Sequence, residues 1–312
     1  MELIKYIAPF DASGALSQLE KIFGVEERLL EECQLNGSEA GYNKDIVYLA
    51  YENGTLLGMI HGTIPLKTPN LAGLSGMFTT EAARGKGIGK LLFSKIVEEV
   101  SMHGVRLAVL GTGNPVAAKL YAQFGFGFCP GSNVMARFSQ GGMVDFVRDS
   151  YRELHGNAQI SRGTPAMRIP VIPLVLQQEF GLILDINTAI FNTSAVTQRS
   201  CMGLFPRYEA LRKQGGDYFM AFDEAGVLGA VCSVCPRESG SCRADFFALP
   251  AFEPVVPSMI HQLEANFGSL YFEIAHSDTG KAHILQENGW TATADGCCAA
   301  GDLMIKTVIY SR

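Results

Sequence analysis

The chain has 312 residues, which favours two domains over one, and 47% of them are hydrophobic against 18% charged. The sequence has no run of about 18 apolar residues and a net charge of −6, which argues against a membrane span and against a nucleic-acid-binding surface. The N-terminus lacks the basic start and apolar core of a signal peptide, so we expect a cytoplasmic protein with mostly reduced cysteines.

The first 140 residues alternate between strand-like and helix-like segments. Asn53 and Gly54 separate two apolar runs, which is a strong signal for a β-hairpin. Gly76 interrupts the next strand-like run and predicts a bulge or a separation of strands there. The predicted elements are, in chain order, a strand at 3–7, helices at 15–23 and 26–34, strands at 46–51, 56–63 and 71–79, a helix at 88–100, a strand at 105–110, a helix from 114 and a strand at 134–138.

The stretch RGKGIGK at 84–90 follows a predicted strand and opens a predicted helix. Such a turn offers backbone N–H groups without intrahelical partners and the positive end of the helix dipole, and phosphate is the usual ligand. Its glycines let the backbone approach an anion closely, and Arg84 and Lys86 add positive charge. The spacing fits neither the P-loop nor the dinucleotide-binding fingerprint.

A second informative stretch runs from Asn114 to Phe126, NPVAAKLYAQFGF. Asn114 is suited to cap a helix whose first position is Pro115. Ala117, Leu120, Tyr121 and Phe124 then share one helix face, and Gly125 is suited to end the helix.

These two stretches resemble the motifs of the GCN5-related N-acetyltransferases (GNAT). R-x-x-G-x-G matches residues 84–89, and N-x-x-A-x-x-L-Y-x-x-x-G-F matches residues 114–126 at every fixed position. The resemblance is specific over about residues 45–128. It implies a mixed-sheet α/β acetyltransferase fold for 1–140, with acetyl-CoA as co-substrate.

The resemblance also implies roles for individual residues. The backbone of Gly85, Gly87, Ile88 and Gly89 would hold the pyrophosphate, assisted by Arg84 and Lys86. The strand end at Phe78 and Thr79 would pair with the pantetheine arm, and Asn114 would hydrogen-bond the same arm. A backbone N–H near Phe78 would polarise the thioester carbonyl. Tyr121 would protonate the departing thiolate.

In this family the amine attacks the thioester directly and needs a base to become neutral. The strand at 71–79 contains no glutamate, so His61 is the best candidate for that base. The acceptor is expected to be a small-molecule or peptide amine; aminoglycosides, polyamines, amino acids and protein N-termini stay open, as does the acyl-chain preference. We expect the loops at 37–44 and 65–70 to line its site. The alternative is a non-catalytic module that binds acyl-CoA as a sensor or regulator.

The second half faintly repeats the first. Residues 141–168 are predicted as a connector that includes a helix at 143–154, and 169–312 as a degenerate GNAT-like domain of a tandem protein. Strands are predicted at 218–222, 227–234, 243–248 and 270–274, and a helix at 254–267. No phosphate loop follows the strand at 243–248, so this domain is expected to lack a cofactor site. The Cys232–Cys235 pair has no second C-x-x-C, so we predict no metal site; a homodimer stays open.

Overall fold

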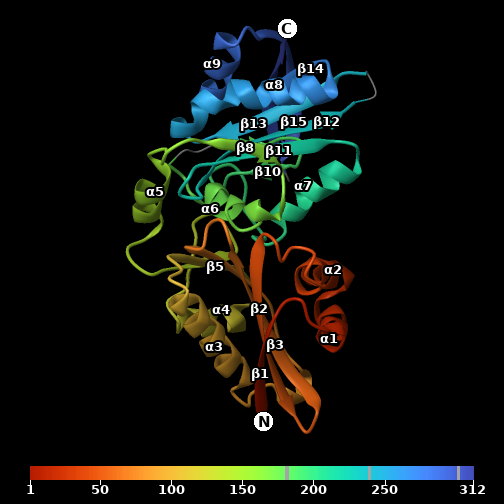
Figure 1. The fold of residues 1–312 in the computed structure, drawn as a ribbon, viewed down its shortest axis with the longest axis vertical. Coiled ribbons are helices and arrows are strands. Elements are labelled where there is room, and N and C mark those ends of the chain that lie inside the picture. The colour runs from red at the N-terminus through yellow and green to blue at the C-terminus, as the bar shows by residue number, and fades with distance from the viewer. Residues whose placement is uncertain (180–182, 238–239, 301–302) are drawn as a thin grey trace. The chain divides into compact units, whose positions relative to one another are not determined.

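The computed structural model describes residues 1–179, 183–237, 240–300 and 303–312 (Figure 1). They form two compact units. The first unit comprises Met1–Cys129, Asn133–Gly141 and Arg199–Gly203, and the second comprises Pro130–Ser132, Gly142–Gln198 and Leu204–Arg312. Among the described residues, none of the helices is both long and apolar enough to span a membrane.

Within its described residues, the first unit is built on one seven-stranded mixed sheet in the order β1-β2-β3-β4-β5-β7-β6. All neighbouring strands are antiparallel except β4 and β5, which are parallel. The strands are β1 (Glu2–Ile7), β2 (Asn43–Glu52), β3 (Thr55–Pro65), β4 (Leu71–Thr79), β5 (Leu107–Gly111), β6 (Gly127–Phe128) and β7 (Val134–Phe138). Every strand predicted here is confirmed; the short β6 was not predicted.

Two local predictions from glycine are also confirmed. Asn53 and Gly54 both have positive φ, 50° and 76°, which is the conformation of a tight turn between β2 and β3. Gly76 has φ of 57°, and two residues of β4, Gly76 and Met77, stand opposite the single residue Ile60 of β3. This bulge bends β4 just where it leaves β5.

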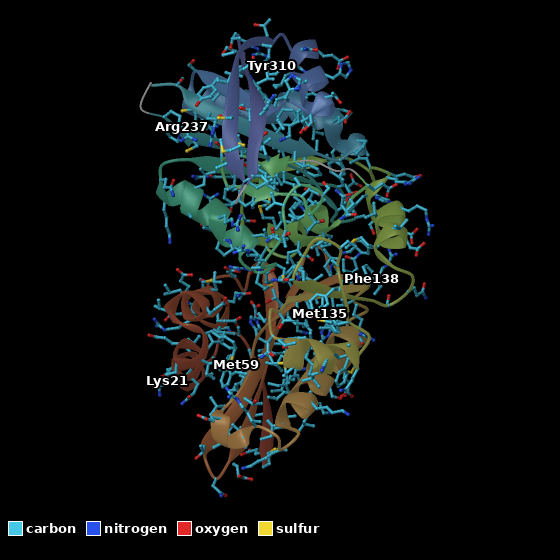
Figure 2. The ribbon with its side chains drawn as sticks, turned by 180° about the vertical axis from the view of Figure 1, so that it is seen from behind. Lys21, Met59, Met135, Phe138, Arg237 and Tyr310 are labelled. Carbon is cyan, nitrogen blue, oxygen red and sulfur yellow. The ribbon has the colours of Figure 1, made fainter. Side chains whose placement is uncertain are left out.

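Helices cover both faces of the first sheet (Figure 1). The helices are α1 (Ser13–Phe23), α2 (Val25–Leu35), α3 (Ile88–Met102) and α4 (Pro115–Ala122). Met59 belongs to the buried cluster that α1 and α2 share with the sheet, and Met135 to the cluster under α3 and α4 (Figure 2). The alternation of side chains along each strand supplies both clusters, since successive residues point to opposite faces.

In its described residues, the second unit also contains a seven-stranded sheet, in the order β8-β11-β12-β13-β14-β16-β15. Its one parallel pair, β13 with β14, takes the same place in the order as β4 with β5. The strands of this sheet are β8 (Gln159–Arg162), β11 (Asp217–Phe222), β12 (Leu228–Pro236), β13 (Cys242–Ala248), β14 (Leu270–Ala275), β15 (Thr291–Ala300) and β16 (Leu303–Ser311). The two sheets therefore have the same topology.

The remaining elements of the second unit are two short strands and its helices. Among the described residues they are α5 (Met143–Tyr151), η2 (Pro165–Met167), α6 (Val171–Leu176), β9 (Ile183–Asp185), β10 (Ile190–Phe191), α7 (Leu204–Lys213), η3 (Pro250–Val255), α8 (Val256–Phe267) and α9 (Thr279–Glu287). The strands predicted at 218–222, 227–234, 243–248 and 270–274 and the helix predicted at 254–267 are confirmed. The elements that were not predicted are β8, α6, β9, β10, α7, β15 and β16. The segment predicted as a connector contains α5 and β8, and β8 is the edge strand beside β11.

Candidate functional site

The first unit has a cavity where β4 and β5 separate. The two strands pair only over Leu71–Leu74 and Leu107–Leu110, and β4 then continues to Thr79 while β5 ends at Gly111. A cavity of about 320 Å³ opens at this point, lined on one side by Ser75–Met77 and on the other by Gly111–Asn114. The parting of two parallel strands therefore creates the space.

The cavity extends from exposed side chains to fully buried ones. Phe23, at the end of α1, is 51% exposed, and Glu27 of α2 is also exposed. At the buried side, Phe93 of α3 is 0% and Tyr121 of α4 is 7% exposed. Glu27 and Tyr121 therefore line one cavity that includes both exposed and buried side chains.

Tyr121 lies where the sequence predicts a proton donor. Its ring stacks on Phe93 with centroids 4.5 Å apart, and its side chain lines the cavity. Burial raises the pKa of the Tyr121 hydroxyl to about 12, so the group stays protonated at neutral pH. The structure gives this hydroxyl no hydrogen bond to another described residue, which leaves its proton available to a bound molecule.

The predicted phosphate loop adopts a conformation that glycine favours. Gly85 and Gly87 have φ of 76° and 78°, and the space beside both Cα atoms is open. The first intrahelical bond of α3 is donated by Leu91 to the Gly87 carbonyl, so the N–H groups of Ile88 and Gly89 have no partner within the helix. The start of α3 therefore presents backbone N–H donors without intrahelical partners, which is the arrangement that binds anions at helix N-termini in general.

Charge and close approach at this loop also fit a phosphate ligand. Arg84 and Lys86 are both exposed beside the start of α3. A Cβ on Gly89 would lie 3.4 Å from Met77 and 3.6 Å from Thr79, so the second residue of α3 packs directly against β4. The loop thus lies against the unpaired end of β4.

Asn114 caps α4 as predicted. Its side-chain Oδ1 accepts hydrogen bonds from the backbone N–H groups of Val116 at 2.9 Å and Ala117 at 3.4 Å. The amide oxygen is thereby occupied by the helix, and the Nδ2 group is the part of Asn114 that can serve a ligand in the cavity it lines.

The role predicted for Phe78 needs a correction. The N–H of Thr80 donates to the Leu57 carbonyl at 2.8 Å, and Phe78 lies two residues earlier in the same antiparallel ladder. Because hydrogen-bonded pairs recur every second residue, the N–H of Phe78 also faces β3. The N–H groups of Met77 and Thr79 face the opposite side, where β5 has ended. Either neighbour, and not Phe78, can polarise a carbonyl there.

The structure also does not bring His61 to the cavity. His61 is 0% exposed, with Nδ1 at 2.6 Å from Glu31 and Nε2 at 2.9 Å from Asp45. Burial alone lowers the pKa of His61, but the two carboxylates outweigh it and raise this pKa to about 10. An imidazolium that is protonated at neutral pH cannot accept a proton, so the predicted base role of His61 is wrong on both access and charge.

Two residues that line the cavity were missed by the sequence analysis. Glu27 contributes the cavity's only charged side chain among the described residues. Partial burial, and then the charges of Glu31 and Glu26, raise the pKa of Glu27. Cys201 belongs to the 199–203 segment of the first unit, and burial raises the pKa of its thiol to about 12. Nothing in the local sequence relates either residue to the two motifs, because tertiary contacts bring them together.

The loops expected to hold the acceptor do not contribute to this cavity. Residues 37–44 and 65–70 are absent from its lining as described, and α1, α2 and the segment 199–203 take that place. The reason is topological. Helices α1 and α2 cover the sheet face that carries the bulge of β4, whereas the two loops lie at the other end of β2 and β3.

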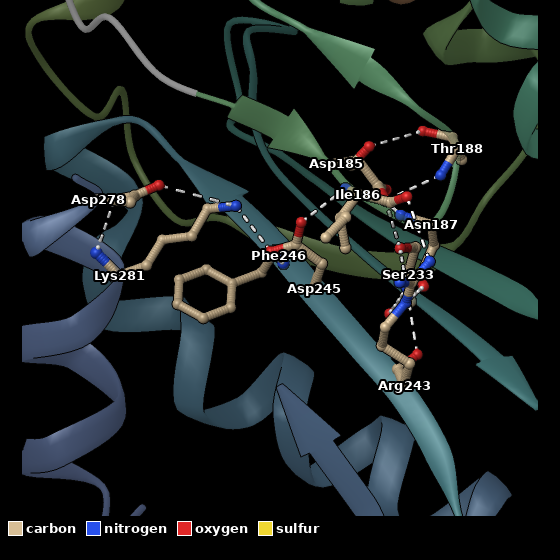
Figure 3. A network of polar contacts seen from close by, with 10 residues as sticks. All are labelled: Asp185, Ile186, Asn187, Thr188, Ser233, Arg243, Asp245, Phe246, Asp278 and Lys281. Atoms are coloured by element: carbon tan, nitrogen blue, oxygen red, sulfur yellow. Dashed lines mark hydrogen bonds and ion pairs between the residues drawn. The ribbon is translucent and has the colours of Figure 1, made fainter. Parts of the chain in front are cut away.

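A buried ion pair lies at the corresponding place in the second unit (Figure 3). Strands β13 and β14 pair from Cys242 to Ala244, and Asp245 is the next residue. Lys281 of α9 donates to Asp245 at 2.7 Å, and both residues are at most 5% exposed. Asp278 lies 3.9 Å from the same ammonium. Burial lowers the pKa of Lys281, but these carboxylates outweigh it and raise that pKa.

The second unit also differs at the start of its long helix. Leu249 donates to the Gly229 carbonyl at 2.7 Å, as Thr80 does to Leu57 in the first unit. The 3₁₀ helix η3 then continues directly into α8, which carries Pro257 in its first turn. Proline removes one of the N–H donors that an anion site at a helix start requires.

A comparison with protein families matches residues 16–126 to the Acetyltransferase (GNAT) family. This range runs from within α1 to beyond the end of α4 and includes residues 84–90 and Tyr121. No curated protein matches the chain significantly.

Solved acetyltransferase structures resemble about half of the chain. An N-acetyltransferase from Staphylococcus aureus Mu50 is 13% identical with a TM-score of 0.37, covering 50% of this chain and 97% of that one. A ribosomal-protein-alanine N-acetyltransferase from Brucella melitensis is 14% identical with a TM-score of 0.37, covering 49% and 98%. A phosphinothricin acetyltransferase from Sinorhizobium meliloti in complex with AcCoA is 11% identical with a TM-score of 0.38, covering 50% and 87%.

Proposed function

We propose that the protein transfers the acetyl group of acetyl-CoA to a primary amine, on the premise that residues 16–126 match the Acetyltransferase (GNAT) family. Acetyl-CoA is the co-substrate of this family. Three features that lie along the free part of β4 carry the proposal. The open start of α3 packs against Met77 and Thr79, the end of β4 has no partner strand on its β5 side beyond Leu74, and the protonated hydroxyl of Tyr121 lines the cavity beside Met77.

The residues of the first unit fit acetyl-CoA. The N–H groups of Ile88 and Gly89 at the start of α3, with Gly85, Gly87, Arg84 and Lys86, would hold the pyrophosphate. The backbone of Met77 and Thr79 would pair with the pantetheine arm as an added strand, and the Nδ2 group of Asn114 would donate to it. Arg84 and Lys86 are charged and exposed, whereas Asn114 lines the cavity. The pantetheine arm would therefore run from the loop at 84–90 into the cavity.

Tyr121 would act as the general acid. Its hydroxyl is held neutral by burial and would donate its proton to the departing thiolate. Cys201 lines the same cavity, but its thiol is also held neutral by burial, and a thiol rather than a thiolate is a poor nucleophile. We therefore favour direct attack of the amine on the thioester over an acetyl-cysteine route.

We further propose that residues 169–312 form a GNAT-like domain that binds no acetyl-CoA. Support comes from the shared strand order, from the direct passage of η3 into α8, and from Lys281 and Asp245 lying at the place that corresponds to the cavity. Cofactor binding would then be limited to one molecule per chain.

Isothermal titration of the full chain with acetyl-CoA tests the binding part of this proposal. We expect saturable binding with one equivalent per chain. A titration without binding would overturn the proposed function. Binding of two equivalents per chain would overturn the proposal that the second unit binds no acetyl-CoA.

A further inference from the structure

The cavity of the first unit is mostly apolar and has one charged side chain among its described lining residues, and this composition bears on the identity of the acceptor. Apolar side chains make up most of its wall, among them Leu19, Phe23, Ile60, Leu74, Met77 and Met202. The only charged side chain among the described lining residues is Glu27. No described lysine, arginine or histidine lines the cavity.

We propose that the acceptor is an apolar primary amine with a single ammonium group, and that Glu27 binds this ammonium and takes its proton. The proposal rests on the acetyl-transfer function proposed above and names the acceptor class for that same cavity.

The wall composition excludes several other acceptor classes. A free amino acid carries a carboxylate, and no cation among the described lining residues would pair with it, so its burial would be costly. A polyamine or aminoglycoside carries several ammonium groups, and one carboxylate can pair with only one of them. A hydrocarbon or aromatic body, by contrast, would gain from contact with the apolar wall.

Glu27 is suited to receive an ammonium for a geometric reason. It lies one helical turn before Glu31 on α2, and Glu31 is engaged with His61, whereas the structure gives Glu27 no hydrogen bond or ion pair with a described residue. Although its side chain is exposed overall, the cavity wall desolvates Glu27 in part; this partial burial, and then the charges of Glu31 and Glu26, raise its pKa and make it a stronger proton acceptor than an ordinary glutamate. The buried His61 imidazolium and the neutral Cys201 thiol and Tyr121 hydroxyl are the other titratable groups nearby.

The proton balance of the step is complete. The ammonium gives one proton to the Glu27 carboxylate, and the neutral amine forms a C–N bond with the thioester carbonyl carbon. The C–S bond breaks, and the sulfur takes the Tyr121 proton. The second proton that nitrogen loses restores Tyr121, and the proton on Glu27 passes to solvent. The products are the N-acetylamine and CoA thiol.

The test compares Glu27→Gln with Glu26→Gln in the full-length protein. Glu26 is a neighbouring exposed carboxylate on the same helix that does not line the cavity, so its substitution removes the same charge. The probes are hexylamine, ethylamine and spermidine as acceptors, with N,N-dimethylhexylamine and hexan-1-ol as inhibitors. The dimethyl compound carries an ammonium but has no second N–H to lose, so it cannot yield a neutral amide.

We expect the wild type to prefer hexylamine to ethylamine and to spermidine by about tenfold or more in kcat/KM. N,N-dimethylhexylamine should inhibit about tenfold more tightly than hexan-1-ol, because a hydrogen bond to a charged group favours the ammonium. In Glu27→Gln this inhibition ratio should fall to about one and kcat/KM for hexylamine should drop about 20-fold or more. Glu26→Gln should change both quantities much less, because the charge of Glu26 is the smallest of the three influences on the Glu27 pKa.

An unchanged inhibition ratio in Glu27→Gln, or a preference of the wild type for spermidine or ethylamine, would overturn the proposal. Titration with acetyl-CoA separates this failure from that of the proposed function. If Glu27→Gln and the wild type bind acetyl-CoA equally and only the acceptor results disagree, the acceptor class alone is wrong. If the wild type does not bind acetyl-CoA, the proposed function itself fails.

Discussion

Tyr121 lies against Phe93 with the two ring centroids 4.5 Å apart and 30° between their planes. The contact fixes the ring of the proposed general acid by packing alone, since its hydroxyl has no hydrogen bond to another described residue. Position and proton donation therefore come from different parts of the side chain, and a single substitution can separate them.

We predict that Tyr121→Phe lowers kcat by about 100-fold and changes acetyl-CoA affinity little, because the ring contact with Phe93 is kept and only the proton donor is lost. Steady-state kinetics and calorimetric titration measure the two quantities. Full activity in the Phe variant would assign Tyr121 to packing and make water the proton donor.

The second prediction concerns the phosphate loop. Gly89 is the second residue of α3, and its φ is not positive, so Val there avoids the strain that the left-handed Gly87 would add. The new side chain would crowd Met77 and Thr79, beside the helix start that offers the unpaired N–H groups. We expect Gly89→Val to weaken acetyl-CoA binding at least about tenfold, or about 1.4 kcal/mol.

Gly14 supplies the matched control for this substitution. It is the second residue of α1 and has open space around its Cα, so Gly14→Val carries the same loss of helix propensity away from the loop. If calorimetry gave the two variants equal affinities for acetyl-CoA, the start of α3 would not be the site that binds its phosphates.

The third prediction concerns the charge of His61. Because its pKa is raised to about 10, the imidazolium should stabilise the fold fully below about pH 6.5 and lose that contribution as the pH rises toward 10. Nitrogen NMR of the labelled ring should show it still protonated at pH 8. Titration near the ordinary value of about 6.5 would contradict the buried ion cluster and restore His61 as a candidate base.

The fourth prediction separates the second unit from catalysis. Lys281→Met removes the buried partner of Asp245 and should destabilise the second unit by about 3 kcal/mol. Trp290, the chain's one tryptophan, is 2% exposed in that unit, so its fluorescence during denaturation reports on it. Acetyl-CoA affinity measured well below the transition should not change.

The exposed Lys213→Met serves as its control, because it removes a lysine at the end of α7 without touching a buried carboxylate. Two results would contradict the proposal that the second unit takes no part in cofactor binding and contains a stabilising ion pair. One is a loss of acetyl-CoA binding in folded Lys281→Met, and the other is an unfolding transition, followed by Trp290 fluorescence, like that of the control variant.

Local signals made much of the first unit predictable. The Asn53–Gly54 turn, the Gly76 bulge and the Asn114 cap each depend on the conformational preference of one or two residues, and all three appear as predicted. The second unit gave weaker signals. β15 was missed because most of its side chains are small and exposed, and its pairing with β16 maintains the strand.

The site needed information that local sequence does not contain. Glu27 and Cys201 are 174 positions apart, and only the fold brings both to the cavity. The carboxylates that hold His61 charged come from α2 and β2, so its sequence neighbours could not exclude it as a base. The direction of the Phe78 N–H depends on the register of β4 against β3, which a motif does not specify.

The most direct test of acetyl transfer uses the full-length protein with acetyl-CoA and a panel of primary amines. Thiol release is followed in solution, and the amines are then analysed by mass spectrometry for an added acetyl group. The account predicts thiol release that depends on an amine and matches the N-acetylated product in amount. Binding of acetyl-CoA without acetylation of any amine would contradict it and identify the first unit as an acyl-CoA sensor.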